Sequence, residues 1–498
     1  MMQFGHCRFG TFAFVSLVAL FVAACGSNDV GPTSTLAPVP EFGAGGTGGG
    51  AGTGGAAPEA AAGQAGASGP TQTPGEDPGT PPLDGDAGSP NEPLGPNGAV
   101  NLFSELLGIP DAQVTEKITL AANRIFGIGT GEPNVPVADA GYRVYYELPQ
   151  NPEQAFIWAA DSNDVRSEGM SYGMMIAVQL DMRQQFDRLW NFAKAYMQFP
   201  ADSELSAWRH YFRWQGSVNT ANPSDWQVVY NPQTGPAPDG DEYFAAALFL
   251  ADRRWGSAGA IDYRAEASAI SAAMLNNQPN ASRTAIIDPT SNMVVFFPQG
   301  NSASFSDPSY HLPAFYELFA EQGPEADAAR WRQVAETSRQ YFVSSAHPAT
   351  GLHPDYANFD GTPNAGGDLH DQFRYDAWRV VMNMAVDYAW GSRDERLKTQ
   401  IEKYHTFFST RLGEGNVAAA LFALDGSNSS GGGSTALTAT LATGSLVSES
   451  ASRTQFVQNL WDVEQQQGTY RYYQETVYML GLLTTAGRYV FSFDGASE

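Results

Sequence analysis

The sequence predicts an all-α protein in which six helical hairpins close into a barrel, preceded by a long linker. After residue 100, twelve segments are candidate helices, and several of them space their apolar residues at i, i+3 and i+4, the pattern of helices with one buried face. Loops rich in glycine, proline and polar residues separate them. Strand-like alternation is scarce, and its best short candidates are residues 142–146 and 293–297.

Twelve helices joined alternately by short and long loops fit six hairpins arranged in a closed ring. An open α-solenoid is the competing arrangement, but the sequence contains no repeat of fixed period. In a closed barrel, the long loops at one end would line a groove. The helices are expected near residues 111–126, 167–181, 183–199, 242–255, 259–276, 309–321, 325–345, 371–391, 394–411, 434–448, 452–463 and 470–487.

The first 25 residues have the features of a secretory signal. An apolar run from Phe12 to Ala24 ends in small residues and Cys25, and it is too short to serve as a transmembrane helix. The Val-Ala-Ala-Cys end resembles a bacterial lipoprotein signal, in which the cysteine becomes the lipidated first residue. We therefore expect an exported protein anchored through Cys25 to the bacterial cell envelope. The alternative is an ordinary cleaved signal and a secreted protein.

Residues 26–100 are expected to form a disordered linker. They consist largely of Gly, Ala, Pro, Ser and Thr and contain no Lys or Arg. With almost no large apolar side chains, such a segment cannot bury enough surface to fold. The predicted organisation is therefore a signal peptide over 1–25, a linker over 26–100 and one catalytic domain over 101–498.

The net charge limits the macromolecules that the protein can bind, and the cysteine content limits its disulfides. The formal net charge is −26 and the isoelectric point is near 4.5, so nucleic acids and anionic membrane surfaces are poor partners. Any membrane contact is expected only through the lipid at Cys25. The other cysteine, Cys7, would leave with the signal, so no intramolecular disulfide is expected. We expect a monomer.

Glu168 is the first of three acids in unusual contexts. It stands between Ser167 and Gly169, directly before an apolar helical run, and Ser167 is the expected N-cap. A helix N-terminus favours the ionised carboxylate, whereas apolar surroundings favour the neutral acid that a general acid needs. From this segment alone, a capping carboxylate remains the simpler interpretation.

Asp239 and Asp376 are the other two acids. Asp239 lies in a loop that leads directly into an apolar helix, and Asp376 lies in an aromatic and apolar segment. Arg379, three residues further on, shares a helical face with Asp376 and could hold it ionised. Asp239, Asp241 and Glu242 could cap the helix or bind calcium. They lack the spacing of a full calcium loop, so capping is favoured.

Five blocks of the sequence resemble glycoside hydrolase family 8, and they follow one another in the order of that family. Each block alone is a weak signal, but together they span residues 110 to 490. The blocks are Ser167-Glu168-Gly169-Met170-Ser171-Tyr172-Gly173, Ala237-Pro238-Asp239-Gly240-Asp241-Glu242-Tyr243-Phe244, Asp307-Pro308-Ser309-Tyr310-His311-Leu312-Pro313-Ala314-Phe315-Tyr316, Tyr375-Asp376-Ala377-Trp378-Arg379 and Tyr470-Arg471-Tyr472-Tyr473.

The resemblance implies an (α/α)6 barrel that hydrolyses β-1,4-linked glycans with inversion at the anomeric carbon. It implies that Glu168 is the general acid and Asp376 the general base, and that Asp239 holds the sugar at the cleavage point. Inversion needs these two carboxyl groups roughly 6.5–9.5 Å apart, which leaves room for a water molecule.

The resemblance also assigns substrate contacts. Tyr310 and Arg379 match positions that line the subsite at the cleavage point, and Tyr375 belongs to the block that holds the base. Trp214 and Tyr473 are similar in context to aromatic residues of the family that stack on sugar rings.

Substrate and mode of action are expected from the same blocks. Those around Asp239 and Tyr310 look more like xylan-active members than cellulases, so xylan or xylo-oligosaccharide is expected, with a β-1,4-endoglucanase as the alternative. Members that release xylose from reducing ends carry a Leu-His-Pro plug. It is not evident between Asp425 and Ser434, which favours endo cleavage and leaves a reducing-end exo-oligoxylanase as the second alternative.

No metal or organic cofactor is expected. The seven histidines lack metal-ligand spacing, and His311 and His370 are interpreted as polar groove or structural residues. Two other classes compete with a hydrolase: a non-catalytic glycan-binding lipoprotein, and a helical lyase or isomerase. The three matched acids oppose the first, and the lack of a Tyr/His or metal constellation opposes the second.

Overall fold

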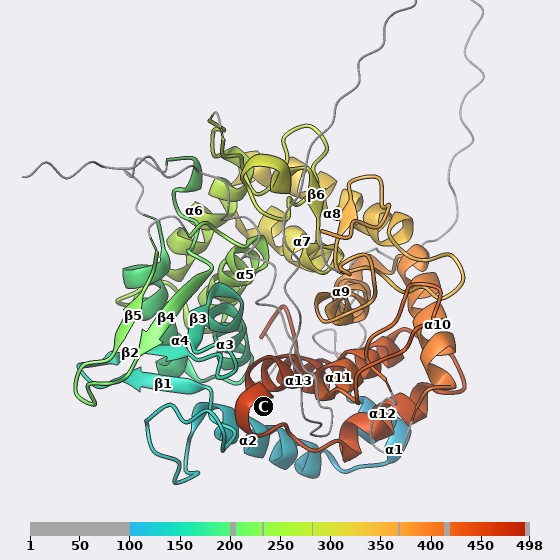
Figure 1. The fold of residues 1–498 in the computed structure, drawn as a ribbon, viewed down its shortest axis with the longest axis horizontal. Helices are drawn as coiled ribbons and strands as arrows, with labels where there is room; N and C mark the ends of the chain where they lie inside the picture. The colour runs from blue at the N-terminus through green and yellow to red at the C-terminus, as the bar shows by residue number, and fades with distance from the viewer. Residues whose placement is uncertain are drawn as a thin grey trace, which may run out of the picture. The chain divides into compact units, whose positions relative to one another are not determined.

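The computed structural model describes residues 100–199, 206–231, 234–280, 282–366, 369–412 and 419–493. The predicted signal peptide with Cys25, and the predicted linker up to residue 99, lie outside these residues. Each of the twelve predicted helices is present, and together they form a closed ring (Figure 1). The prediction of an all-α barrel of six hairpins is therefore confirmed.

The barrel has an inner and an outer ring of helices that alternate along the chain (Figure 1). The inner helices pack side by side, and α13 contacts both α11 and α3, so the ring closes. The inner helices are α3 (Ser167–Gln179), α5 (Pro238–Trp255), α7 (Pro313–Gln322), α9 (Val380–Asp387), α11 (Thr435–Thr443) and α13 (Arg471–Thr485). The outer helices are α2 (Asp111–Phe126), α4 (Arg183–Phe192), α6 (Tyr263–Asn276), α8 (Ala328–Ser344), α10 (Glu395–Ser409) and α12 (Arg453–Asp462).

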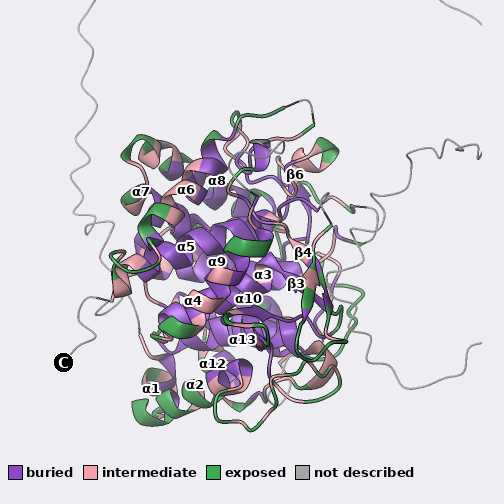
Figure 2. Ribbon diagram, turned by 90° about the vertical axis from the view of Figure 1, so that its left-hand side faces the viewer, coloured by how far each residue is buried: buried purple, intermediate pink, exposed green. Residues whose placement is uncertain are grey.

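Burial distinguishes the two rings. Every residue of α11 is buried, and α5 is buried from Pro238 to Ala251, because an inner helix has neighbours on all sides. Outer helices such as α4 bury only one face, and Figure 2 shows their exposed residues at the rim. The sequence reflects this: α4 is amphipathic, whereas α11 is a run of Ala, Leu and Thr.

Small residues let the inner helices approach closely. A Cβ atom at Gly481 of α13 would lie 2.8 Å from the Cβ of Ala439 and 2.9 Å from its carbonyl carbon. These atoms are the backbone of α11 and the Cβ fixed to it, so they cannot move aside. Gly481 is therefore required by the contact between α11 and α13, which explains a glycine inside a helix that it would otherwise weaken.

Short strands lie at one end of the barrel. β1 (Tyr145–Leu148) pairs with β2 (Asn151–Ile157), β6 (Phe305–Ser306) with β7 (Ala357–Asn358), and a three-stranded sheet has the order β3-β4-β5, all antiparallel. In that sheet β3 (Asp164–Arg166) faces β4 (Gln215–Asn219), with Val165 opposite Gly216, and β4 faces β5 (Gln227–Val229). Because β3 runs directly into α3, the sheet positions the first turn of that helix.

Several local predictions differ from the structure. The predicted strand 142–146 begins only at Tyr145, and 293–297 forms a single bridge between Val294 and Ile287. The short helix α1 (Leu102–Leu107), which packs on α12, was not predicted. Helix α7 begins at Pro313 rather than 309, because a 3₁₀ turn capped by Asp307 precedes it.

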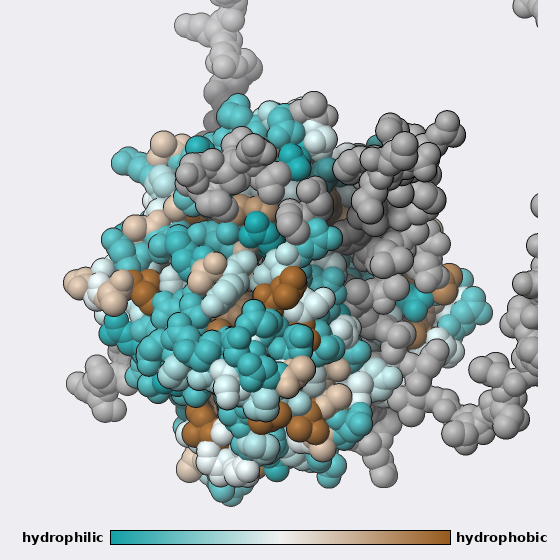
Figure 3. Space-filling model, turned by 60° about the vertical axis from the view of Figure 1, so that its left-hand side comes forward, coloured by the Kyte–Doolittle hydropathy of each residue, from teal (hydrophilic) through white to brown (hydrophobic). Residues whose placement is uncertain are grey.

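The surface shown in Figure 3 is mostly hydrophilic, with hydrophobic residues scattered singly rather than joined in one patch. Within the described ranges, no helix is both long enough and hydrophobic enough to cross a lipid bilayer. The large apolar side chains instead form one continuous core through the barrel.

Candidate active site

Arg379 lies at the centre of a cluster of acids at one end of the barrel. Its side chain is buried, and one terminal nitrogen donates hydrogen bonds to the carboxyl groups of Glu168 at 2.9 Å and Asp239 at 3.1 Å. The other terminal nitrogen donates to Asp376 at 3.0 Å. One guanidinium group thus joins the three acids that the sequence analysis selected, although they are far apart in the chain.

The inner helices explain why these residues meet. Glu168 lies in the first turn of α3, Asp239 in the first turn of α5, and Asp376 in the 3₁₀-helix Asp376–Arg379 that leads into α9. Inner helices of an alternating barrel all run in the same direction, so their N-termini lie at one end. The shared guanidinium holds Glu168 and Asp376 no more than about 8 Å apart, given the width of its fork.

A fourth acid, Asp307, completes the cluster. Its Oδ2 lies 3.9 Å from Arg379 and has no hydrogen-bond partner in the described structure. Of the four acidic side chains, Glu168 is the most exposed, at 13% against 6% for Asp376, 5% for Asp239 and 0% for Asp307. Glu168 is therefore the acid that a ligand reaches most easily.

Burial raises the pKa values of Glu168, Asp239 and Asp307, because desolvation disfavours a charged carboxylate. It is the main cause of the raised pKa of Glu168, which the charge of Arg379 opposes and that of Asp376 increases. The same causes raise the pKa of Asp239 to about 7 and that of Asp307 well above its usual value. One arginine cannot balance four carboxylates, so part of the cluster stays protonated near neutral pH.

Tyr472 supports Glu168 from the opposite side to Arg379. Its hydroxyl donates a hydrogen bond of 2.8 Å to Oε1 of Glu168. A Cβ atom at Gly169 would lie 2.4 Å from the Tyr472 ring, so only glycine after Glu168 allows this approach. Arg166 is the residue before α3, and Ser167, the predicted N-cap, is already inside the helix with no hydrogen-bond partner for its hydroxyl in the described structure. That capping prediction was wrong.

Asp355 fixes the backbone next to Asp376. The backbone N–H of Ala377 donates to Asp355 Oδ1 at 3.3 Å, and His370 Nδ1 lies 3.1 Å from Oδ2. Burial raises the pKa of Asp355 to about 6. The His370 ring stacks on Tyr356, with centroids 4.1 Å apart. His370 is thus a structural support close to Asp376.

His311 is also structural. It is fully buried, and its ring nitrogens pair with the hydroxyls of Ser306 at 3.0 Å and Ser338 at 2.8 Å. Burial lowers its pKa to about 3, so the ring is neutral. This agrees with the interpretation of His311 as structural rather than catalytic.

The side chains of Asp241 and Glu242 do not cap α5. Asp241 accepts a hydrogen bond from the backbone N–H of Phe212 at 3.0 Å, and Glu242 accepts one from the Tyr316 hydroxyl at 2.9 Å. Both are buried because α5 is an inner helix, so the capping interpretation was wrong. Among the described residues, no three His, Cys, Asp or Glu side chains are grouped as metal ligands.

The predicted aromatic residues lie near the same cluster, in part only through their backbone or hydroxyl groups. The Arg379 guanidinium lies 5.8 Å from the centre of the Tyr310 ring, and the Tyr473 hydroxyl donates to the carbonyl of Tyr375 at 2.8 Å. The carbonyl of Trp214 accepts from the backbone N–H of Ser167 at 2.9 Å, next to Glu168. Except for Cys25, which lies outside the described residues, all the predicted site residues meet at this end of the barrel.

Sequence reasoning missed five members of the site. Asp307 and Ser309 stand in a block that was selected for Tyr310, Tyr172 follows Glu168 by one helical turn, and Tyr472 stands next to Tyr473 in the last block. Ser309 and Tyr172 both accept hydrogen bonds from Arg379, at 2.7 Å each. Asp355 had no signal, because its role depends on a loop that only the fold brings behind Asp376.

Buried carboxyl groups of differing exposure that meet at one end of a helical barrel fit the paired acids of a glycoside hydrolase. The family model of glycosyl hydrolases family 8 matches residues 157–487. The chain therefore belongs to this family.

Individual relatives agree with that assignment. The chain is 38% identical over 365 residues to the reducing-end xylose-releasing exo-oligoxylanase Rex8A of Paenibacillus barcinonensis, covering 70% of this chain and 88% of the relative. A xylanase from Teredinibacter turnerae, solved as a catalytic mutant with xylohexaose, has a TM-score of 0.69 at 38% identity over 78% of this chain and 97% of that one. Endoglucanase 2 of Ruminiclostridium josui is 27% identical over 340 residues, covering 68% of this chain and 67% of the relative.

Replacing Arg379 by methionine should lower the free energy of unfolding by about 3–5 kcal/mol at pH 8, because it leaves several buried carboxyl groups without a counter-charge. The loss should be smaller at pH 5. These carboxyl groups have raised pKa values in the folded protein, so they can take up protons as the pH falls and no longer need the arginine. Urea unfolding at both pH values measures the difference.

Arg396→Met is the matched control. Arg396 forms exposed ion pairs with Glu336 and Asp394, which contribute only about 0–1 kcal/mol. Equal stability of the Arg379→Met and Arg396→Met variants at pH 8 would contradict the central role of Arg379.

Proposed function

We propose that the enzyme hydrolyses β-1,4 bonds of xylan or xylo-oligosaccharides with inversion, Glu168 acting as general acid and Asp376 as general base. The observation that carries this proposal is that Glu168 accepts a hydrogen bond from one terminal nitrogen of Arg379 and Asp376 accepts one from the other. The shared guanidinium keeps the two carboxyl groups close enough to act on one glycosidic bond, and inversion is what the resemblance to family 8 implies.

Glu168 is suited to donate a proton to the leaving oxygen. Burial raises its pKa above the usual range, which favours the protonated form that a general acid needs. When that proton leaves, the carboxylate that forms accepts hydrogen bonds from Tyr472 and Arg379. These contacts stabilise the negative charge that develops during bond cleavage.

Asp376 is suited to activate water from the other side of the sugar. Arg379 stabilises its carboxylate form, and the backbone contact between Ala377 and Asp355 fixes the turn that carries it. Asp239, with a pKa near 7, can accept or donate a hydrogen bond. It would bind sugar hydroxyls more strongly as the ring distorts towards the transition state.

Xylan is favoured over cellulose because the relatives at 38% identity carry xylan-related names, whereas the endoglucanase is 27% identical. A β-1,4-endoglucanase remains the alternative. Reducing-sugar release from xylan and from carboxymethylcellulose compares the two, and faster hydrolysis of the cellulose derivative would reverse the assignment.

Endo cleavage is favoured over release of single xylose units. The segment from Ser427 to Gly433 is exposed and carries only small polar side chains and glycine, so it offers no bulky group to block a groove. Residues 413–418, which precede it, lie outside the described structure. Xylohexaose should give mainly xylobiose to xylotetraose at early times, whereas xylose and xylopentaose alone would indicate a reducing-end exo-oligoxylanase.

Replacing Glu168 by glutamine or Asp376 by asparagine should each lower kcat on xylan on the order of 100- to 10,000-fold, because each change removes a proton-transfer group. Glu116→Gln, an exposed change on α2, is the control and should leave kcat unchanged. Near-normal activity in either active-site variant, with a folded protein by circular dichroism, would reject the assigned roles.

The alkaline limb of the pH profile of kcat/KM should report the loss of the proton from Glu168. Replacing Tyr472 by phenylalanine removes a hydrogen bond that stabilises the ionised carboxylate. The pKa of Glu168 should then rise, and the limb should move to higher pH by up to about one unit, the equivalent of one charge-assisted hydrogen bond.

Tyr473→Phe is the matched control, because this neighbouring hydroxyl donates to the Tyr375 carbonyl instead. An alkaline limb that stays in place in Tyr472→Phe, or moves equally in both variants, would show that Glu168 does not control it.

A further inference from the structure

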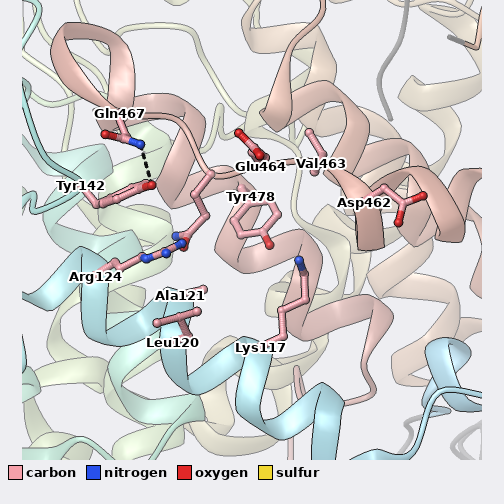
Figure 4. Close-up of a pocket in the computed structure, with 11 residues that line it drawn as sticks. Lys117, Leu120, Ala121, Arg124, Tyr142, Asp462, Val463, Glu464, Gln467 and Tyr478 are labelled. Atoms are coloured by element: carbon pink, nitrogen blue, oxygen red, sulfur yellow. Dashed lines mark hydrogen bonds between the residues drawn. The ribbon is translucent and has the colours of Figure 1, made fainter. Parts of the chain in front are cut away.

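A cavity of about 440 Å³ lies between α2 and the segment that leads from α12 into α13 (Figure 4). It shares no residue with the acid cluster around Arg379. Helix α13 separates the two: Tyr472 in its first turn contacts Glu168, whereas Tyr478, further along, lines the cavity. The lining includes Lys117, Leu120, Arg124, Tyr142, Gln467 and Tyr478.

Tyr478 brings a polar group to the wall of the cavity. The residue is only 1% exposed, and in Figure 4 its hydroxyl points into the cavity, towards the ammonium group of Lys117. A ligand hydroxyl in the cavity could exchange a hydrogen bond with this phenol.

The charges of the lining favour a neutral ligand over an anion. Lys117 and Arg124 bring two positive charges, but Asp462 and Glu464 bring two negative ones. The two cations are also engaged already. Lys117 Nζ donates to the carbonyl of Trp461 at 2.9 Å, and Arg124 donates to the side chain of Gln465 at 2.9 Å. An anion would therefore meet opposing carboxylates and no free cation.

The remaining groups match the chemistry of a sugar. The amide of Gln467 donates to the Tyr142 hydroxyl at 2.6 Å, which leaves amide and phenol oxygens able to accept from sugar hydroxyls. Leu120, half exposed, together with Ala121 and Val463, offers an apolar surface for the C–H face of a ring. Such a mixture of apolar surface and a few polar groups is typical of small-ligand sites of this volume.

We propose that this cavity binds one or two neutral pyranose units of a glycan chain, as a second carbohydrate site outside the catalytic cluster. The choice of xylose units rests on the proposed function. A polymer held at both sites has a raised effective concentration at the catalytic cluster. The second site would therefore lower KM for xylan without changing the turnover of short oligosaccharides.

Isothermal titration calorimetry tests the proposal on the Glu168→Gln protein, in which cleavage is expected to be on the order of 100- to 10,000-fold slower. Xylohexaose should bind at two sites per chain. Adding Gln467→Ala and Tyr478→Phe should weaken the second site roughly tenfold, the effect of losing one or two hydrogen bonds. Adding Glu116→Gln, which lies on α2 outside the cavity, should leave both sites intact.

In the otherwise wild-type enzyme, Gln467→Ala with Tyr478→Phe should raise KM for polymeric xylan several-fold and leave kcat/KM for xylotriose unchanged. A single xylohexaose site, or a second site that the two changes do not affect, would overturn the proposal. So would binding of sodium glucuronate or inorganic phosphate in place of neutral sugars. Binding of cellohexaose rather than xylohexaose at both sites would support a sugar cavity while rejecting xylan as the substrate.

Discussion

The site depends on a single buried positive charge that faces four carboxyl groups. Arg379 contacts Glu168, Asp239 and Asp376 directly, and Asp307 lies 3.9 Å away. In a low-dielectric environment these charges interact strongly, and unpaired ones are costly. The cluster therefore retains protons that separate carboxylates in water would lose. A carboxylic acid and a carboxylate side by side are what acid–base hydrolysis requires.

The barrel provides this arrangement through the N-termini of its inner helices. Each of α3 and α5 carries its acid in the first turn, and Asp376 stands at the start of the segment that continues into α9. Close approach depends on glycine. A Cβ atom at Gly240 would lie 2.4 Å from the Ser167 hydroxyl, just as one at Gly169 would meet the Tyr472 ring. The glycines next to Glu168 and Asp239 thus belong to the geometry of the site.

Much of the fold could be predicted because helix periodicity is a local property. The α2 prediction matches the observed bounds, and the order of the hairpins followed from the loops. The ends of the helices were more difficult to predict. Ser167 has the chemistry of an N-cap, but strand β3, which precedes it, places the cap at Arg166. The strands were mostly missed, since β3 and β4 are short and gain their partners only through the fold.

The site was predictable to the extent that its residues stand in recognisable blocks. Glu168, Asp239 and Asp376 were selected on that ground. That one arginine joins all three was not predicted, because a sequence shows only the neighbour relation between Asp376 and Arg379. Asp355 and the cavity beside Tyr478 arise from contacts between distant segments, which no local pattern records.

Proton NMR of the first product tests the central claim most directly. If Glu168 donates its proton while a water activated by Asp376 attacks from the opposite face, cleavage of xylohexaose must release new reducing ends in the α-configuration before mutarotation. The account predicts the α-anomer signal first and the β-anomer signal later. Early appearance of the β-anomer would mean retention through a covalent intermediate, and the assigned pairing of acid and base would then be wrong.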